Sequence, residues 1–345
     1  MGETKKKLLI FSACIIVVGL ILALVGFSMG GKFTISKQDA GFKIVDNTDM
    51  IEKNEELSQF NSIEVDSKLG KIDIIKSNRY GIEVKYAKDE GDVNYSIEDG
   101  KLLVKQDKLQ NSMFGNINFC IGSNCQESYL KIYVPGNVDL TNLNVKANSA
   151  DFTMNDINVN EIYINCNYGD IISRNIVTNN LTLELNNGDI DLENIKSNNT
   201  ILKSSYGDIK IRNSEFNILS NDMNNGDIEF ENVKVENNNT INNEYGEITS
   251  NNLISNGLKV KSNNGDIDLD GEFKGITSLS SHYGDINFRT NISKDVYNYS
   301  ASCNYGDINI DGDKFEKKVQ NNGNNNTQNT IDATSNNGDI NLDFK

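Results

Sequence analysis

An acidic residue follows glycine in a short phrase that the chain repeats nine times, and this regular row of carboxylates is the first feature that could do chemistry. Calcium prefers oxygen ligands of this kind, so weak calcium binding along the row is one interpretation. The calcium-binding nonapeptide repeat, however, contains several glycines, whereas here a single Gly-Asp pair recurs at about twice that length. We therefore favour turn capping by the aspartate side chain, and we expect no cofactor and no dedicated metal site. A degenerate copy one period upstream adds Asp151, which follows Ala150. The row comprises Asp151, Asp170, Asp189, Asp208, Asp227, Glu247, Asp266, Asp285, Asp307 and Asp339.

The residue before each glycine alternates between tyrosine and asparagine through most of the repeats. A tyrosine in every second repeat indicates that a continuous stack of rings would be too crowded. Packing at a corner is the favoured interpretation, and a strip of tyrosines that binds sugar rings is the alternative. In sequence order these residues are Tyr168, Asn187, Tyr206, Asn225, Tyr245, Asn264, Tyr283, Tyr305 and Asn337.

Catalytic chemistry has little support in the sequence. His282 is the only histidine, and nothing near it resembles a catalytic triad or a metal-ligand set. Polysaccharide lyases and hydrolases on β-helices gather acidic and basic residues at one locus, but here the acids are spread along the repeats. Arg174, Arg212 and Arg289 form no obvious cluster. We expect no catalytic residues and no enzyme activity.

The spacing of the glycines identifies the architecture that must position these residues. Successive glycines are separated by 19, 19, 19, 20, 19, 19, 22 and 32 residues, and a fixed period of this length is typical of a solenoid. Glycine at each corner is explained by a need for positive φ, which other residues adopt at a cost of about 1 kcal/mol or more. The predicted corner glycines are Gly169, Gly188, Gly207, Gly226, Gly246, Gly265, Gly284, Gly306 and Gly338.

An isoleucine two places after every corner glycine is the most uniform apolar position. Apolar and polar residues alternate around it with the period of two that is typical of a strand with one buried face. The sequence therefore predicts an all-β fold, a parallel β-solenoid of about 19-residue coils in which equivalent residues stack at about 4.8 Å. The predicted core ladder is Ile171, Ile190, Ile209, Ile228, Ile248, Ile267, Ile286, Ile308 and Ile340.

The five cysteines divide by position. Cys166 and Cys303 occupy equivalent inward positions several coils apart, too far along the axis to form a disulfide, and are interpreted as small core residues. Cys120 and Cys125 are close enough in sequence to close a small disulfide loop if the domain is extracellular, and two unpaired thiols are the alternative.

The N-terminus contains 22 uncharged residues from Leu8 to Met29, preceded by Lys5, Lys6 and Lys7. This length fits a transmembrane helix, and the lysines favour a cytoplasmic N-terminus. The sequence thus predicts a single-pass membrane anchor with the C-terminal domain outside the cytoplasm. A cleaved signal peptide and a lipoprotein signal at Cys14 are alternatives.

The chain divides into seven predicted segments. They are a cytoplasmic N-terminus at 1–7, the transmembrane anchor at 8–29, a stalk at 30–59, diverged β-rich first coils at 60–140, regular coils at 141–312, a polar insertion at 313–330 and a terminal coil at 331–345. We expect the insertion to fold near the last coils and protect their open edge, or else that edge to meet a partner.

Thirty-three basic residues against 49 acidic ones give a net charge of −16. This charge argues against nucleic acid as a partner, because nucleic-acid-binding proteins present a basic face.

The N-terminal anchor, the strand-rich segment ending in "YLKIYVP" and the serial "GDI" coils resemble the bacterial putative-adhesin family of β-strand-repeat proteins, a family of unknown function. The resemblance covers about residues 60–345 and implies a membrane-tethered protein of the cell envelope with no catalytic residues. We therefore expect an adhesin or scaffold that presents an extended acidic surface to wall polymer or to a surface or membrane protein. An extracytoplasmic regulator of envelope-stress signalling is the alternative, and a carbohydrate-active enzyme is less favoured.

Overall fold

The computed structural model describes residues 3–28, 33–38, 41–44, 50–88, 91–107, 118–121, 128–321 and 327–344, and these residues form two compact units. The first unit contains helix α1 (Glu3–Ser28) and a small antiparallel sheet of β1 (Phe33–Gln38), β2 (Gly41–Ile44) and β9 (Asn118–Ile121). The second unit contains the stacked coils.

Helix α1 includes Glu3 and the three lysines of the N-terminus within its bounds. A bilayer crossing needs about 20 consecutive apolar residues. Among the described residues, no helix combines the length and the apolar character that a membrane span requires. The predicted transmembrane anchor at 8–29 is therefore not confirmed.

The predicted stalk at 30–59 contains regular structure. Besides β1 and β2, it includes β3 (Met50–Glu56), which pairs with β6 (Gly81–Ala87) in the sheet of the second unit. A highly charged edge strand has the composition of a linker, because charges on an edge discourage pairing with another chain. Composition alone therefore does not distinguish an edge strand such as β3 from a linker.

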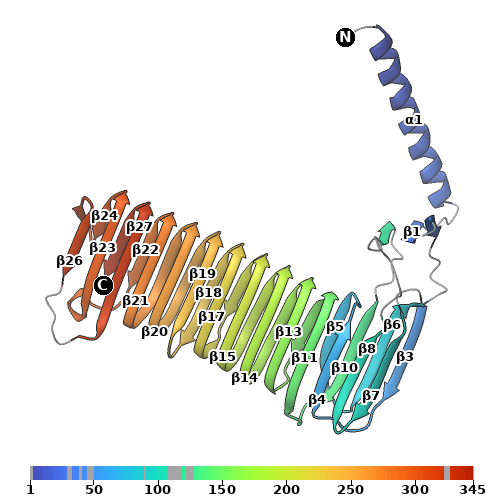
Figure 1. Cartoon of the computed structure of the whole chain (residues 1–345), viewed down its shortest axis with the longest axis horizontal. Helices are drawn as coiled ribbons and strands as arrows, with labels where there is room; N and C mark the ends of the chain where they lie inside the picture. The colour runs from blue at the N-terminus through green and yellow to red at the C-terminus, as the bar shows by residue number, and fades with distance from the viewer. Residues whose placement is uncertain are drawn as a thin grey trace. The chain divides into compact units, whose positions relative to one another are not determined.

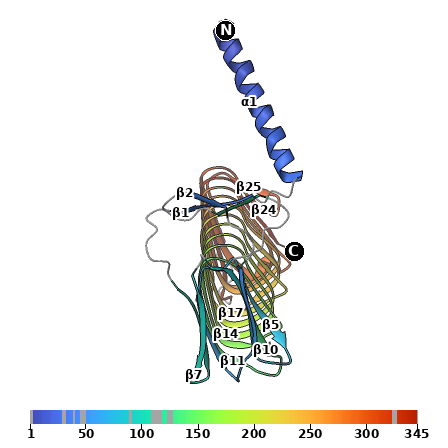
Figure 2. The ribbon, with the colours of Figure 1, turned by 90° about the vertical axis from the view of Figure 1, so that its right-hand side faces the viewer.

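The second unit is a parallel β-solenoid, as the sequence predicts. Where the coils are most regular, a single strand carries almost a whole coil, and Ile171 of β14 (Ile171–Asn187) lies opposite Ile190 of β15 (Ile190–Tyr206). Figure 1 shows the coils side by side, and Figure 2 shows them nested when viewed along the stack. The remaining strands of the regular coils are β11 (Leu140–Ser149), β12 (Asp151–Asn155), β13 (Val159–Tyr168), β16 (Ile209–Arg212), β17 (Glu215–Asn225), β18 (Ile228–Val235), β19 (Asn239–Tyr245), β20 (Ile248–Asn264), β21 (Ile267–Tyr283) and β22 (Ile286–Thr290).

The stack begins with a coil made by β4 (Ser62–Ser67) and β5 (Lys71–Ser77), which pair in parallel with β11 and β12. Beyond this coil lie β8 (Lys101–Gln106) and β10 (Tyr129–Pro135), also parallel to it. Two antiparallel strands then follow, because β7 (Val93–Glu98) pairs with β8 and β6 pairs with β10. The first coils are therefore of mixed topology.

At the other end the coils do not stack in sequence order. Strands β27 (Asn329–Asn337) and β28 (Ile340–Phe344) pair with β21 and β22 on one side. On their other side they pair with β23 (Tyr297–Tyr305) and β24 (Ile308–Ile310). The segment predicted as a terminal coil therefore lies between two earlier coils. The reason is geometric: every coil offers equivalent stacking faces, so the chain can leave a gap of one coil and fill it later.

The outermost coil is covered by strands from the predicted polar insertion. Strand β25 (Asp313–Phe315) is antiparallel to β24, and β26 (Lys318–Asn321) is antiparallel to β23. A parallel coil cannot continue from these reversed strands in the same register. Antiparallel strands therefore close the stack at both ends, which limits end-to-end growth.

The core lies inside the coils and is dominated by Ile, Leu, Val and Phe. A second bend, which the sequence analysis missed, occurs six residues after the corner glycine, where asparagine adopts positive φ in several coils. Asparagine tolerates this conformation because its short side chain bonds locally. Here its amide donates to the equivalent side chain of the preceding coil. These residues are Asn175, Asn194, Asn213, Asn232 and Asn252, with φ between 50° and 60°.

Candidate functional site

The Gly-Asp corners form one continuous edge of the solenoid. All nine predicted corner glycines have φ between +114° and +151°, and all nine isoleucines of the predicted ladder are 0% exposed. At Gly207, φ is +114° and an added Cβ would lie 2.1 Å from the carbonyl oxygen of Gly188. Glycine is therefore required both for the backbone conformation and for the close approach of neighbouring coils.

The nine acidic residues after the corner glycines, together with Asp151 after Ala150, form what we call the aspartate row. In most coils a carboxylate oxygen accepts a hydrogen bond from the backbone N–H of the equivalent residue in the next coil, at 2.7–3.0 Å. The aspartate thus caps the neighbouring coil rather than its own turn. These oriented donors offset the repulsion between like charges about 4.8 Å apart.

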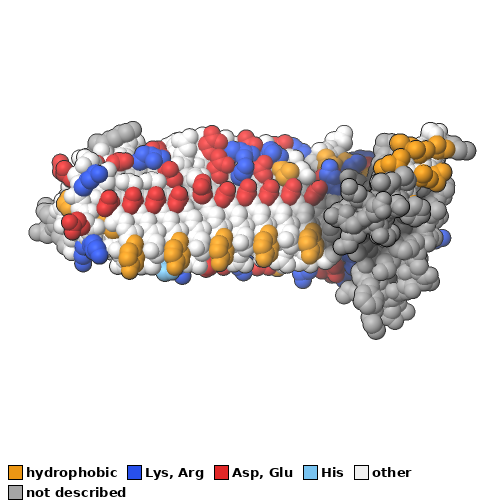
Figure 3. Space-filling model, turned by 90° about the horizontal axis from the view of Figure 1, so that it is seen from above, with side chains coloured by type: hydrophobic (Ala, Val, Ile, Leu, Met, Phe, Trp, Pro, Cys, Tyr) orange, Lys and Arg blue, Asp and Glu red, His pale blue; other side chains and the backbone are white. Residues whose placement is uncertain are grey.

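Five tyrosines form a second row along the same edge, which we call the tyrosine strip: Tyr168, Tyr206, Tyr245, Tyr283 and Tyr305. They are 51–72% exposed. Figure 3 shows them in a line parallel to the acidic side chains. Because Tyr283 lies opposite Asn337 and Asn337 lies opposite Tyr305, the out-of-order coil restores the strict alternation that the sequence order breaks.

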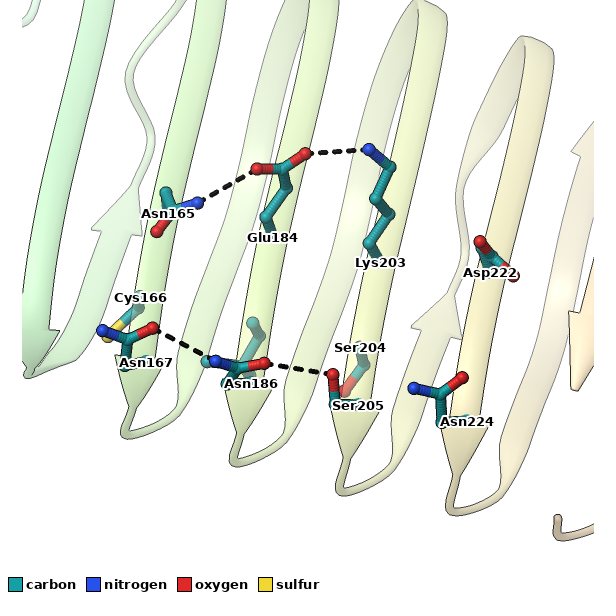
Figure 4. A pocket seen from close by; sticks show the side chains of 11 residues that line it. Asn165, Cys166, Asn167, Glu184, Asn186, Lys203, Ser204, Ser205, Asp222 and Asn224 are labelled. Carbon is teal, nitrogen blue, oxygen red and sulfur yellow. Dashed lines mark hydrogen bonds and ion pairs between the residues drawn. The ribbon is translucent and has the colours of Figure 1, made fainter. Parts of the chain in front are cut away.

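A polar row borders the strip, formed by the residues two places before each corner glycine together with Asn148, two places before Ala150. Side chains in this row hydrogen-bond from coil to coil, for example from Asn186 Nδ2 to Asn167 Oδ1 at 3.2 Å and from Ser205 Oγ to Asn186 Oδ1 at 3.1 Å (Figure 4). The row comprises Asn148, Asn167, Asn186, Ser205, Asn224, Glu244, Asn263, His282, Asn336 and Asn304.

Two shallow depressions lie along this polar row. The first, of about 370 Å³, has Glu184 in its lining, and Figure 4 shows this carboxylate between Asn165 and Lys203. Glu184 accepts hydrogen bonds from Lys203 (2.9 Å), Asn165 (3.0 Å) and Tyr163 (2.9 Å). The bond from Lys203, followed by that from Tyr163, lowers the pKa of Glu184, so it is an ionised acceptor rather than a proton donor. The second depression, of about 630 Å³, includes His282 and Asn336.

The arginines are placed differently from the sequence expectation. Arg174 and Arg212 both bind Asp191, at 3.2 Å and 2.6 Å, and Arg174 also binds Glu193. They lie two coils apart in sequence, but Asp191 lies on the coil between them, so long side chains reach it from both sides. Each charge in this cluster is paired with an opposite charge. Arg289 forms a separate pair with Asp268 and Asp270.

A second carboxylate with several donors lies in the first coils. Glu83 accepts hydrogen bonds from the hydroxyls of Tyr129 (2.7 Å) and Tyr133 (2.8 Å) and from Lys131 (3.0 Å). These interactions, led by the Tyr129 bond, lower the pKa of Glu83 to about 2. Burial, followed by the bond to Glu83, raises the pKa of Tyr129 to about 12. The pair is held in its hydrogen-bonded form across the whole physiological range, which suits a structural contact.

The remaining candidate residues from the sequence are the single histidine and the cysteines. His282 lies beside Tyr283, with ring centroids 4.3 Å apart. Cys166 and Cys303 are buried free thiols at inward positions, 3% and 4% exposed, and burial raises the pKa of both. The predicted disulfide between Cys120 and Cys125 involves Cys125, which lies outside the described residues. Within those residues, no group of three or more His, Cys, Asp or Glu side chains could hold a metal ion.

Most of the chain matches a known protein family. The profile of the Toastrack DUF4097 family matches residues 60–251 and 178–343, which together cover most of the chain. The chain belongs to the Toastrack DUF4097 family. No curated protein matches it. Membership in this family of unknown function agrees with the predicted resemblance and assigns no ligand to the edge.

Several solved structures are similar to this Toastrack chain. One is a putative cell adhesion protein from Clostridium sporogenes, with 12% identity, 86% of this chain and 100% of that chain covered, and a TM-score of 0.23. Others are a putative adhesin from Bacteroides fragilis (12% identity, 86% and 97% covered, TM-score 0.28) and one from Parabacteroides merdae (14% identity, 71% and 97% covered, TM-score 0.32). At these values the likenesses carry no argument about function.

Proposed function

We propose that the protein is a non-enzymatic adhesin or scaffold of the cell envelope, and that its solenoid presents an extended acidic edge to wall polymer or to another surface protein. The observation that carries this proposal is the arrangement of the exposed groups. Carboxylates, tyrosines and amides each recur along the axis in parallel rows, so a ligand would be contacted over many coils rather than in one pocket. Extended surfaces of this kind are how solenoid proteins bind partners.

Two features argue against catalysis. Glu83 and Glu184 have lowered pKa values, whereas a general acid needs a raised one. Asp191 is shared between two arginines. A carbohydrate-active enzyme would lose activity on wall glycan when Glu184→Gln or Asp191→Asn is introduced. We expect neither the parent nor the variants to release soluble sugars.

Co-sedimentation of the full chain with insoluble wall glycan, with cross-linking to envelope proteins in parallel, tests the proposal. Retention in either assay supports an extended binding role, and failure in both would contradict it. A location outside the cytoplasm belongs to the proposal and is tested by protease accessibility in intact cells. The proposal does not depend on α1 spanning a membrane.

Regulation of envelope-stress signalling is the second candidate, and the presence of a second compact unit besides the solenoid favours it, because such a module could bind a signalling protein. Replacing residues 1–49 with an unrelated segment separates the two functions. The exchange must stop there because β3 begins at Met50 and pairs within the solenoid unit. A scaffold keeps its partner after this exchange, whereas a regulator that binds through α1, β1 or β2 loses it.

Weak calcium binding along the aspartate row is a separate proposal. One oxygen of most carboxylates already accepts a backbone bond, which leaves the second oxygen for a cation. A ligand that binds only the folded chain raises its melting temperature. A melting temperature that stays constant at millimolar calcium would end this idea.

A further inference from the structure

The tyrosine strip is the main exposed aromatic feature of the solenoid. Aromatic side chains contribute most when buried, yet each of these five is more than half exposed. Among the described residues, no hydrogen bond involves any of their hydroxyl groups. Packing at the corner, the interpretation favoured from the sequence, does not explain why these side chains are more than half exposed and their hydroxyls are left without a hydrogen-bond partner among the described residues.

The spacing of the strip is its most informative property. Neighbouring tyrosines are separated by one coil that carries a half-buried asparagine: Asn187, Asn225, Asn264 or Asn337. Two coils correspond to about 9.6 Å along the axis. This distance leaves each ring isolated from the next, so that a ligand can contact its face.

We propose that the tyrosine strip binds an extended β-1,4-linked glycan, one pair of sugars to each pair of coils. This inference rests on the proposed binding function and names its ligand class. In such a glycan each sugar is turned over relative to the last, so the same apolar ring face recurs at every second sugar. The length of that two-sugar repeat is close to the axial distance between successive tyrosines.

The rows on either side of the strip favour the same ligand class. The aspartate row runs parallel to the strip (Figure 3), so an anionic polymer would be repelled along its whole length, whereas an uncharged or amino-sugar glycan would not. The polar row on the other side supplies amide and hydroxyl groups, among them Asn167, Asn186 and Ser205. Such groups hydrogen-bond to sugar hydroxyl and acetamido substituents and fix the register of the chain.

The number of tyrosines sets the length of the ligand. Four two-coil intervals between Tyr168 and Tyr305 span about 38 Å, which corresponds to about eight sugars. Each ring contributes little by itself, and contacts on one continuous ligand accumulate. Affinity should therefore rise steeply with oligosaccharide length up to about eight sugars and then level off.

Calorimetric titration of the full chain with chitin oligosaccharides of four, six and eight sugars tests this inference. We expect the octamer to bind at least about tenfold more tightly than the tetramer, and an α-1,4-linked glucose octamer to bind no better than the chitin tetramer. Equal affinity for the chitin tetramer and octamer, or for the two octamers, would overturn the proposal.

A spacing variant provides the matched control. Tyr206→Asn combined with Asn225→Tyr keeps the number of exposed tyrosines and the net charge but moves one ring by a single coil. Tyr206 is exposed and Asn225 is half-buried at the same edge of the solenoid, and circular dichroism and the melting temperature check that the variant folds. We expect it to lose at least about tenfold in octamer affinity, and unchanged affinity would overturn the proposal.

Co-sedimentation with wall glycan separates this inference from the proposed function. If a variant with all five tyrosines replaced by asparagine still sediments with wall glycan, the protein is an envelope binder but the strip is not its binding site. If the parent protein binds neither wall glycan nor envelope proteins, the proposed function fails as well.

Discussion

Replacing a corner glycine by alanine should destabilise the solenoid far more than replacing a glycine that has the same sign of φ but open space around it. Gly207 and Gly257 form such a pair, with φ of +114° and +85°. An added Cβ at Gly257 would meet nothing closer than 3.8 Å, whereas at Gly207 it would lie 2.1 Å from the oxygen of Gly188. Both substitutions incur backbone strain of about 1–3 kcal/mol, and only Gly207→Ala also requires two coils to move apart.

The free-energy cost of moving the two coils apart follows from the hydrogen bonds at the corner. Restoring an ordinary contact requires the Gly188 carbonyl to retreat by more than about 1 Å. This movement disrupts bonds that join the same two coils, from Gly188 N to Tyr206 O (3.0 Å) and from Ile190 N to Asp208 O (2.9 Å). At about 1 kcal/mol for each bond, Gly207→Ala should cost about 2 kcal/mol more than Gly257→Ala.

Urea unfolding of the full chain, followed by far-ultraviolet circular dichroism, measures the difference. We expect a clearly lower midpoint for Gly207→Ala, and faster amide hydrogen exchange confined to the coils around it. Equal midpoints for the two variants would refute the claim that close approach between coils, and not φ alone, demands glycine at these corners.

Three further predictions follow from other contacts. Glu83→Gln should lower the free energy of unfolding by about 2 kcal/mol at pH 7, because the carboxylate accepts bonds from two tyrosines and a lysine. The pKa of Glu83 is lowered from 4.5 to about 2, so this stabilisation is present above about pH 4.5 and is lost as the pH falls toward 2. The urea midpoints of parent and variant should therefore converge between pH 4.5 and 2. A constant difference between the midpoints would contradict the assignment. Asn221→Leu should raise the free energy of unfolding by about 1–2 kcal/mol, because Asn221 is 0% exposed and its amide atoms have no hydrogen-bond partner among the described residues. Its neighbours on the adjacent coils are the apolar residues Leu202 and Ile241. A lower melting temperature of the variant would contradict this prediction and indicate that leucine does not fit there. In a background without the native cysteines, Asn304→Cys combined with Asn336→Cys should form a disulfide, because these residues lie on adjacent strands. His282→Cys combined with Asn304→Cys should form none. Non-reducing mass spectrometry detects the disulfide, and the reverse result would show that the coils stack in sequence order.

The regular coils were predictable because the signal is local and repeated. The period of 19 residues places Ile171 opposite Ile190, and alternation within each copy determines which side chains face the core. The sequence also predicted that the acidic residues and the isoleucines form two different rows along the solenoid. The bend at Asn175 and its equivalents was missed, although an asparagine six residues after the corner glycine recurs in five coils. Asparagine tolerates positive φ, but it is so frequent elsewhere in this chain that its recurrence at one position is a weak signal.

The candidate site was only partly predictable. Exposure of the tyrosines could not be decided from the sequence, because the corner interrupts the alternation that assigns side chains to the core or to solvent. The pairing of Arg174 and Arg212 with Asp191 was missed for a related reason. Residues that are unrelated in the linear pattern become neighbours when long side chains reach across adjacent coils.

The sequence by itself determined the coil: its length, its corner glycines, its isoleucine ladder and its acidic edge. Only the tertiary structure decided the order of the last coils, where Asn337 lies between Tyr283 and Tyr305 and completes the alternation of the tyrosine strip. The physical reason is that local patterning specifies which faces a coil offers, while every coil offers nearly the same ones. The choice of stacking neighbour therefore depends on contacts between segments far apart in the chain.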